Sequence, residues 1–479
     1  MARVLLVNSN LMKPPIAPIG LDYIAGHLDA AGHEVELLDL CFEDDWEAAI
    51  RGRLSRAPES HIIGITLRNT DDCYCASLQS FLPQFRDIVG ALQAQAGEAL
   101  LVVGGVGFSL MPRAILDQLP RCVGIVGDGE AALAELAAAV DRGEDAAAVP
   151  GIATRTSQGE WRLGRSAHGA LPRIAASRSL VDNRRYFLEG GQGGIETKRG
   201  CAGRCIYCAD PVAKGRSYRL RPPAEVADEA ESLLAQGVDC LHTCDSEFNL
   251  PPEHALAVCQ EFIRRGLGER LRWYAYCSPG AMTRELAGAM RRAGCVGINF
   301  GADSGCDVML KRLRRDFTAA DIERTANICR EAGITFMCDL LLGGPGETRA
   351  TAEQTIRLMQ RIEPHAVGVA IGLRIYPGTE LARIVAAEGV SPDNPNLVGE
   401  AGDNLDFAWP VFYRAAALGE DYADALHDRL RSDPRFFLGG SRDETDYNYS
   451  ANDALAAAIK AGARGAYWDI LRKARVGGG

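Results

Sequence analysis

The sequence predicts an α/β protein: a doubly wound parallel sheet, an incomplete (β/α)6 barrel, and a small, mainly helical C-terminal domain. Two separate series of short β-branched runs alternate with helical patterns, and a stretch rich in Ser, Gly, Arg and Pro lies between them. Irregular, aromatic-rich sequence follows the second series. We expect a Rossmann-like front domain over residues 1–149, a linker over 150–193, a barrel over 194–390 and a cap over 391–479.

The front domain is expected from five strand-like runs, at residues 3–8, 34–38, 62–66, 100–103 and 123–126. Its clearest helix has Leu21, Ile24 and Leu28 on one face and Gly32 as a stop signal. Ligands of such sheets bind beyond the carboxyl ends of the strands. The linker has room for one hairpin.

The barrel is expected from six further runs, at residues 194–199, 239–244, 272–277, 295–301, 334–342 and 366–373. Helical patterns separate them. Six βα units are too few to close a full eight-stranded barrel. Active-site loops should lie at the carboxyl ends of these strands.

Composition excludes several classes of partner. The net charge of −11 comes from 63 acidic and 52 basic residues without a basic stripe, which disfavours nucleic acid. No signal peptide is visible and no apolar run approaches the roughly 20 residues of a membrane span. We therefore expect a cytoplasmic monomer without membrane contact. Its 15 cysteines should be reduced.

A cysteine motif directly follows the first barrel strand. Cys201, Cys205 and Cys208 form a CxxxCxxC pattern, with Tyr207 just before the last thiol. Three thiolates on one loop can hold three irons of a [4Fe–4S] cluster and leave the fourth iron open. The alternatives are a zinc knuckle, which usually needs a second cysteine pair, and chance spacing.

Residues 200–210 resemble the signature of the radical S-adenosylmethionine superfamily. The resemblance implies that S-adenosylmethionine binds the open iron and that flavodoxin or ferredoxin supplies electrons. The resemblance extends to motifs at later strand ends. At residues 245–247, where the family often has a Gly-Gly-Glu motif, both glycines are missing. The motif that contains Asp303 and Ser304 could instead be a plain turn at the end of a strand. The implied S-adenosylmethionine contacts are Tyr207, then Asp245, Ser246 and Glu247, then Asp303 and Ser304, then Gly343, Gly344 and Pro345.

The front domain is similar to the cobalamin-binding domain that precedes many radical barrels, on the evidence of residues 18–21, 32–35, 104–105 and 127–130. The alternative is a plain Rossmann-like domain whose glycines only form turns. The implied cobalamin contacts are Asn8, Leu67, Arg68, Asn69, Thr70, Gly104, Gly105, Ser109, Gly127, Gly129 and Glu130.

The cobalt ligand should not be a histidine. The Asp-x-His-x-x-Gly motif of histidine-ligated relatives is absent, and His27, His33 and His61 lie in or beside predicted helices and strands. We expect Arg68 near cobalt, where a guanidinium cannot ligate the metal while protonated. Arg68 paired with Asp71 or Asp72 is equally compatible with the sequence.

The family resemblance implies a C-methyltransferase acting on a small molecule or peptide in secondary metabolism, with two molecules of S-adenosylmethionine spent per product. If Arg68 crowds the lower face of cobalt, a polar route that spends one becomes possible. One alternative is an enzyme of the same architecture that cyclises or rearranges its substrate. Another is a non-catalytic cobalamin or metal sensor.

Overall fold

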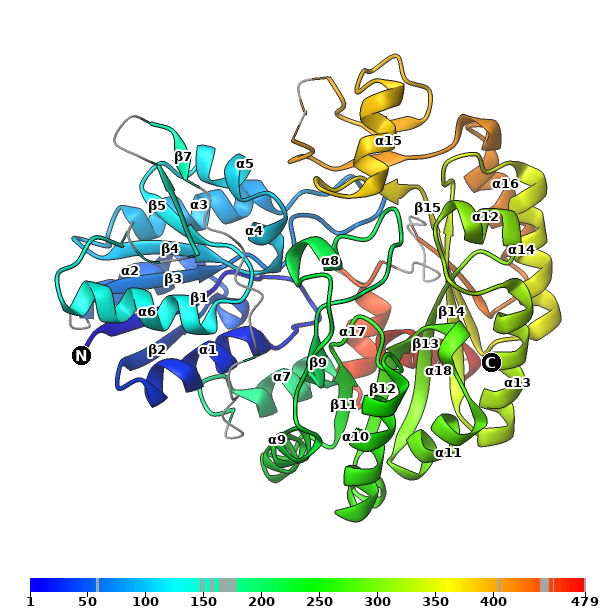
Figure 1. Ribbon diagram of the computed structural model, residues 1–479, viewed down its shortest axis with the longest axis horizontal. Helices are drawn as coiled ribbons and strands as arrows, with labels where there is room; N and C mark the ends of the chain where they lie inside the picture. The colour runs from blue at the N-terminus through cyan, green and yellow to red at the C-terminus, as the bar shows by residue number, and fades with distance from the viewer. Residues whose placement is uncertain are drawn as a thin grey trace.

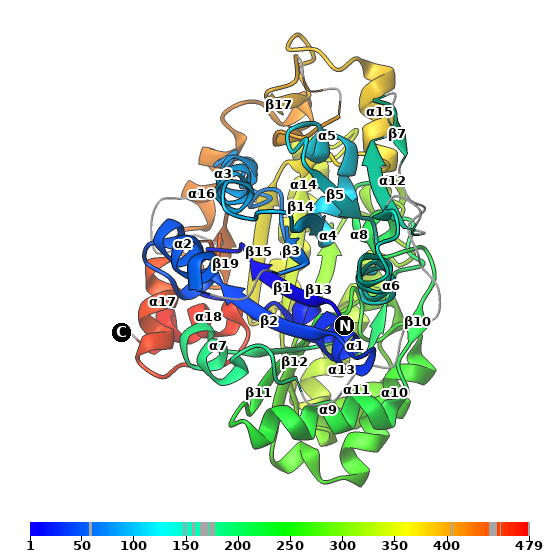
Figure 2. The ribbon, with the colours of Figure 1, turned by 90° about the vertical axis from the view of Figure 1, so that its left-hand side faces the viewer.

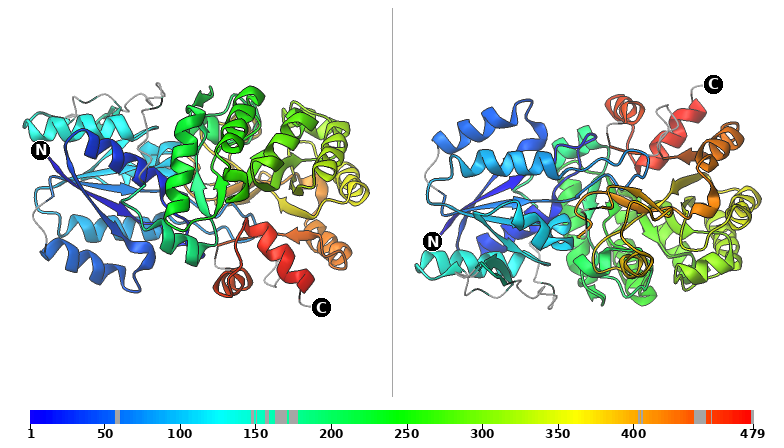
Figure 3. Two further views of the ribbon diagram at one scale, coloured as in Figure 1. Left: turned by 90° about the horizontal axis from the view of Figure 1, so that it is seen from below. Right: turned by 90° about the horizontal axis from the view of Figure 1, so that it is seen from above.

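The computed structural model describes residues 1–56, 60–146, 149, 151–155, 159–162, 171, 178–402, 404, 406–439, 448–450 and 452–477. Two seven-stranded sheets lie side by side along the long axis, and the C-terminal helices pack at one side of the second sheet (Figure 1, Figure 3). The predicted linker falls partly outside the described residues, at 150, 156–158, 163–170 and 172–177.

The front sheet has the strand order β2-β1-β3-β4-β5-β6-β7, with the first five strands parallel. These five confirm the predicted doubly wound sheet, and β6 and β7 add the antiparallel hairpin for which the linker had room. The strands are β1 (Arg3–Asn8), β2 (Glu34–Asp39), β3 (Ile62–Thr66), β4 (Leu100–Gly104), β5 (Cys122–Ile125), β6 (Ile152–Arg155) and β7 (Trp161–Arg162).

Helices cover both faces of this sheet (Figure 2). Alternate residues of β1 enter two different cores: Val4 and Leu6 pack towards α1 and α6, and Leu5 and Val7 pack towards α2 and α3. The helices are α1 (Ile19–Ala30), η1 (Leu40–Phe42), α2 (Trp46–Arg56), α3 (Leu82–Gln93), α4 (Val106–Leu110), α5 (Pro112–Asp117) and α6 (Glu130–Asp141).

The second sheet is a partial barrel in the order β19-β15-β14-β13-β12-β11-β8, with every pairing parallel. Six strands match the six predicted runs: β8 (Gly193–Ile195), β11 (Cys240–Thr243), β12 (Arg272–Cys277), β13 (Cys295–Asp303), β14 (Thr335–Leu342) and β15 (Ala366–Ile371). The first of these runs divides, because β8 ends before a short β9 (Lys198–Arg199) that pairs with β10 (Arg219–Leu220).

Helices wrap the outside of the barrel, while short helices and turns lie at its carboxyl end (Figure 1). The outer helices are α9 (Pro223–Ala235), α10 (Pro252–Arg264), α11 (Arg284–Arg292), α13 (Ala319–Ala332) and α14 (Arg349–Ile362). The remaining ones are α7 (Asn183–Gly190), which precedes β8, and α8 (Asp210–Ala213), η3 (Leu267–Glu269), η4 (Pro279–Ala281) and α12 (Asp307–Arg312).

The C-terminal segment is mainly helical, as expected, but it also adds a strand to the barrel sheet. β19 (Phe436–Leu438) pairs with β15 as a seventh parallel strand that the sequence did not predict. Trp468 packs edge-on against Tyr274 of β12. The other elements are β16 (Leu373–Arg374), α15 (Glu380–Glu388), β17 (Leu397–Gly399), β18 (Val411–Tyr413), η5 (Ala416–Leu418), α16 (Tyr422–Leu430), α17 (Asp453–Lys460) and α18 (Tyr467–Gly477).

Across the described ranges, no helix has both the length and the apolar character needed to cross a bilayer.

Candidate functional site

The cysteine loop runs from β9 to β10 at the carboxyl end of the barrel. Gly200 begins it with φ +87°, and a side chain there would meet the Ser217 carbonyl oxygen at 2.2 Å, so glycine is required. The Cys201 amide donates to the Gly215 carbonyl at 3.0 Å and closes the loop on itself. Ile206 anchors its middle, because its amide donates to Leu313 and its carbonyl accepts from Leu381.

The three predicted cluster thiols share this loop, with Cys201 buried and Cys205 and Cys208 half-buried. Gly203 donates its amide hydrogen to the Cys201 sulfur at 3.4 Å, and Arg315 donates to the Cys205 sulfur at 2.9 Å. Burial raises the pKa of Cys205 to about 11, while Arg315 opposes the rise. A cationic donor beside the thiol favours the thiolate that binds iron, so the loop fits a three-cysteine cluster.

Arg315 contacts several of the predicted site residues, although the sequence analysis did not single it out. Its guanidinium pairs with Asp303 at 3.2 Å and with Glu247 at 3.5 Å, and it donates to the Gly301 carbonyl at 2.8 Å. Tyr207 donates its hydroxyl to Asp303 at 2.5 Å. Three predicted contacts of S-adenosylmethionine, from three separate motifs, therefore surround one arginine. No motif marks Arg315, which lies in a turn after α12.

Glu247 has an unused acceptor. Its Oε2 is buried and has no hydrogen-bond partner within the described part of the chain. Burial raises its pKa to about 7, and Arg315 opposes that rise. A buried carboxylate oxygen without a donor is costly, and the amino group of S-adenosylmethionine would supply one. The residues present thus fit the expected ligand.

Asp245 and Ser304 have structural contacts instead. Asp245 is buried, and its oxygens accept from the Thr197 amide at 2.8 Å, the Thr197 hydroxyl at 2.6 Å and Lys198 Nζ at 3.2 Å. Ser304 is fully buried against the Thr355 hydroxyl at 2.9 Å. Asp245 thus ties β11 to the start of β9, and Ser304 ties β13 to α14. Both partners are distant in sequence. Ligand contacts at these two residues stay a prediction.

The glycine motif after β14 forms a turn held by its own glutamate. Gly343 has φ +96°, and its amide and that of Gly344 donate to Glu347 Oε2 at 2.5 and 3.2 Å. Burial raises the pKa of Glu347 to about 7, against the two amide donors. Pro345 lies within this turn, between Gly344 and Gly346. The Gly343 carbonyl accepts from Ala415 at 2.8 Å, so the turn is rigid.

The predicted cobalamin residues gather where β3, β4 and β5 end. A side chain at Gly105 would meet the Leu67 carbonyl oxygen at 2.5 Å, and one at Gly107 would meet the Asn69 backbone at 3.1 Å. Ser109 donates to the Gly105 carbonyl at 2.8 Å and accepts from the Gly127 amide at 3.0 Å. Leu67, Asn69, Gly104, Gly105, Ser109 and Gly127 thus form one edge, joined by backbone contacts.

Four other predicted cobalamin residues are engaged by the protein. Asn8 donates to Asp39 and to Tyr186, both at 2.8 Å, and Glu130 pairs with Arg199 at 2.9 Å. Buried Thr70 donates to Asp71 at 3.0 Å, and Gly129 packs against Ile24. Asn8 thus ties β1 to α7, and Glu130 ties the front domain to the barrel. Cobalamin contacts at these residues stay a prediction.

Arg68 does not pair with either neighbouring aspartate. Asp71 accepts from Arg374 at 2.9 Å, and Asp72 accepts from Ser77 at 2.7 Å. Within the ranges described above, half-buried Arg68 has no ion pair. Its charge instead acts on a thiol of the barrel: desolvation raises the pKa of Cys244, and Arg68 is one of the cations that oppose the rise.

The three front-domain histidines lie away from this edge. His33 and His61 precede β2 and β3 and accept the amides of Ala2 and Arg3, at 3.3 and 2.9 Å. His27 is in the last turn of α1. Strands β2 and β3 begin where these histidines lie, so the side chains are at the edge of the sheet opposite its ligand-binding end.

Models of known protein families match both halves of the chain. Residues 10–137 match the B12 binding domain model, and residues 195–359 match the radical SAM superfamily model. The tryptophan 2-C-methyltransferase of Streptomyces laurentii is 30% identical, over 97% of this chain and 95% of that protein.

Solved structures extend the likeness to the whole fold. The methyltransferase TsrM from Kitasatospora setae, solved with tryptophan and a S-adenosylmethionine analogue, gives a TM-score of 0.90 at 32% identity, over 99% of this chain and 98% of that one. The cobalamin-dependent radical enzyme OxsB shares the fold at a TM-score of 0.74 and 16% identity, over 90% of this chain and 67% of that one. With its cysteine loop, its glycine edge and this full-length similarity, the chain belongs to the family of cobalamin-dependent radical S-adenosylmethionine methyltransferases.

Proposed function

We propose that this enzyme transfers a methyl group from S-adenosylmethionine, by way of cobalamin, to a carbon of a small indole-containing substrate, with tryptophan as the first candidate. The observation that carries the proposal is the similarity to a tryptophan 2-C-methyltransferase along nearly the entire length of both proteins.

The cofactors, when bound, supply a transferable methyl group and an open iron that chelates S-adenosylmethionine. Cys201, Cys205 and Cys208 would hold the cluster, and the free oxygen of Glu247 would accept from the amino group of S-adenosylmethionine. Arg315 orients Glu247 and Asp303 for this contact. Gly343 and Gly344 would let the backbone come close to the adenine. Ser246 and Pro345, which are also predicted contacts, are the sequence neighbours of Glu247 and Gly344.

Cobalamin would lie on the edge formed by Leu67, Asn69, Gly104, Gly105, Ser109 and Gly127. Arg68 follows Leu67 on this edge and is half-buried, without an ion pair to any residue that the structure describes. A protonated guanidinium cannot ligate cobalt, so Arg68 would place a positive charge near the metal without binding it.

A pair of neighbouring aromatic side chains in the barrel favours an aromatic substrate. Tyr276 of β12 is 42% exposed, and its ring packs against that of His242 at 4.8 Å between centroids. Burial lowers the pKa of His242 to about 4, so the imidazole is neutral at pH 7. Two uncharged rings at the mouth of the barrel give an indole a surface for stacking.

The test is an anaerobic reaction of the reconstituted enzyme with methyl-labelled S-adenosylmethionine, cobalamin, a reductant and tryptophan. Labelled methyltryptophan, detected by mass spectrometry, is the expected product. A tryptophan-containing peptide in a parallel reaction separates a free amino acid from a peptide substrate. An unlabelled, cyclised product would favour the cyclase, and no consumption of S-adenosylmethionine with any indole would favour a sensor.

Electrons would come from a flavodoxin or ferredoxin, and the enzyme would act as a monomer. Size-exclusion chromatography with light scattering tests the second point. Replacing the chemical reductant by flavodoxin and its reductase tests the first.

A further inference from the structure

The two strands that close the cysteine loop place two arginines opposite each other. Arg199 of β9 pairs in register with Arg219 of β10. Like charges directly opposite on an antiparallel pair destabilise it. Both side chains are nearly buried, with exposures of 11% and 8%, so water screens their repulsion poorly. The hairpin needs nearby carboxylates to be stable.

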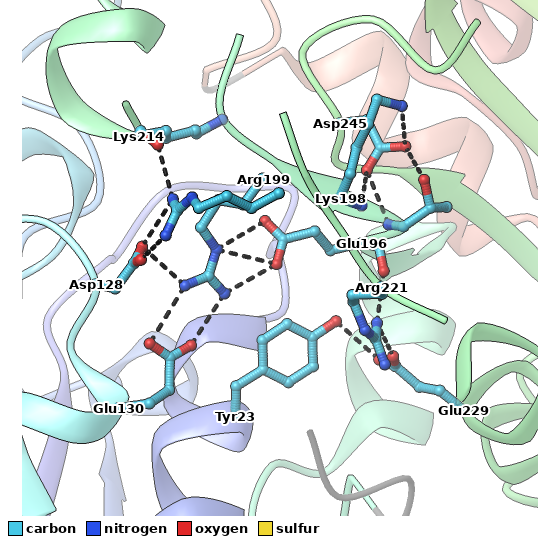
Figure 4. A network of polar contacts seen from close by, with 12 residues as sticks. Tyr23, Asp128, Glu130, Glu196, Lys198, Arg199, Lys214, Arg221, Glu229 and Asp245 are labelled. Carbon is cyan, nitrogen blue, oxygen red and sulfur yellow. Dashed lines mark hydrogen bonds and ion pairs between the residues drawn. The ribbon is translucent and has the colours of Figure 1, made fainter. Parts of the chain in front are cut away.

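The front domain supplies the carboxylate that both arginines share. Asp128, in the turn between β5 and α6, pairs with Arg199 at 2.9 Å through one oxygen (Figure 4). Its other oxygen pairs with Arg219. Glu130, the first residue of α6, pairs with Arg199 at 2.9 Å, and Glu196 does so from the barrel. These carboxylates are also nearly buried.

Asp128 is itself held on the cobalamin-binding edge. Its neighbour Gly127 has φ +88° and donates its amide to Ser109, and Gly129 packs tightly on Ile24 of α1. On the other side, Arg199 lies two residues before Cys201, and Arg219 also donates to the Lys214 carbonyl at 2.8 Å inside the cysteine loop. One carboxylate therefore connects the turn after β5 to both arms of the loop that carries the cluster ligands.

We propose that Asp128 is a positioning residue that closes the cysteine loop and fixes it relative to the cobalamin-binding edge. The pair of arginines makes closure of the loop dependent on the front domain. The two cofactors must be placed to within about 1 Å of the geometry in which the methyl group can reach the substrate. Only the activity measurement below relies on the proposed methyl transfer.

The deciding variant is Asp128→Asn, which keeps the size of the side chain and removes its charge. Its matched control is Asp228→Asn, which removes a carboxylate that pairs with Arg265 at 2.6 Å on the outer surface of the barrel. Both are compared with wild type as full-length enzyme reconstituted with cluster and cobalamin.

Three measurements have defined expectations for Asp128→Asn. Hydrogen exchange over residues 200–218 should lose about tenfold or more in protection. The magnetic interaction between cob(II)alamin and the reduced cluster, measured by electron paramagnetic resonance, should change. The value of kcat should fall about 10- to 100-fold, with KM for S-adenosylmethionine within about threefold of wild type. Asp228→Asn should match wild type in all three.

A purely structural role would give a different pattern. In that case kcat would fall only in proportion to lost cluster, lost cobalamin or unfolded protein, and the magnetic interaction in the loaded fraction would equal that of wild type. Either that result, or equal exchange over residues 200–218 in the two variants, overturns the proposal.

Arg219→Lys provides a second test if Asp128→Asn does not load its cofactors. Lysine keeps the charge but cannot form the same planar fork. In Arg219→Lys loaded with both cofactors, we expect hydrogen exchange over residues 200–218 to lose protection and the magnetic interaction to change relative to wild type. Wild-type exchange together with a wild-type magnetic interaction in this variant would refute the shared role. Hydrogen exchange and the magnetic measurement remain decisive even if tryptophan is not methylated.

Discussion

Gly105→Ala tests whether the cobalamin-binding edge depends on close backbone approach. Gly105 has φ +103° and ψ 171°, a region that only glycine adopts readily. An alanine Cβ would lie 2.5 Å from the Leu67 carbonyl oxygen and 2.9 Å from the Thr66 hydroxyl. The Gly107 amide donates to that same Leu67 carbonyl at 3.0 Å, so the backbone cannot move without breaking this contact.

The expected cost has two sources. The strained backbone conformation costs about 1–3 kcal/mol, and forcing an extra carbon against backbone costs about 1–3 kcal/mol more. Gly32→Ala is the matched control, because Gly32 has φ +83° but no atom within 4 Å of the added carbon. It should lose only the conformational part, about 1–2 kcal/mol.

Thermal unfolding and cobalamin titration measure the two effects. Each kcal/mol corresponds to about 2–4 °C in Tm for a domain of this size, so Gly105→Ala should unfold several degrees below Gly32→Ala. Because the displaced Leu67 carbonyl lies next to Arg68, cobalamin affinity should fall about tenfold or more in Gly105→Ala only. Equal Tm losses with unchanged cobalamin affinity in both variants would refute the reasoning.

Four further predictions follow from the site. Replacing Cys201, Cys205 and Cys208 together by alanine should abolish the visible absorbance of the cluster and the formation of 5′-deoxyadenosine, and unchanged iron content would show that other ligands are used. Replacing His27, His33 and His61 in turn should leave the cobalt spectrum unaltered, whereas a histidine nitrogen coupling in the cob(II)alamin resonance would contradict this. Near-equal S-adenosylhomocysteine and 5′-deoxyadenosine are expected for methylation that spends two molecules of S-adenosylmethionine, and S-adenosylhomocysteine alone would indicate the polar route. The pKa of Glu347 is about 7 in the fold against 4.5 unfolded, so Glu347 contributes stability that is present below pH 4.5 and lost as pH rises through 7. Glu347→Gln should make the free energy of unfolding depend less on pH over this range. An unchanged dependence of the free energy of unfolding on pH would contradict the prediction.

Much of the fold could be predicted because its strands are buried on both faces. Runs such as residues 62–66 and 334–342 are almost wholly apolar, and the structure places β3 and β14 within one residue of those bounds. The seventh barrel strand was not predictable in the same way. β19 has only three residues and follows Asp433 and Pro434, so it is too short to show a period.

The cluster ligands could be predicted because their spacing lies within one loop. Residues whose roles depend on distant partners could not. Asp245 looks like a free acid at a strand end until Thr197, 48 positions away, is found bonded to it. In the sequence alone, nothing separates Arg315 and Arg199 from the rest of its 52 lysines and arginines. Only tertiary structure distinguishes them.

The late position of β19 in the chain affects how the barrel can be made. Phe436 pairs with Val367, so β15 must remain uncovered during synthesis until the segment that carries Phe436 has left the ribosome. An uncovered strand of this kind is a template for pairing with another nascent chain. A gene truncated at the predicted boundary near residue 390 would make that exposure permanent, and its product would be expected to aggregate rather than yield a soluble catalytic core.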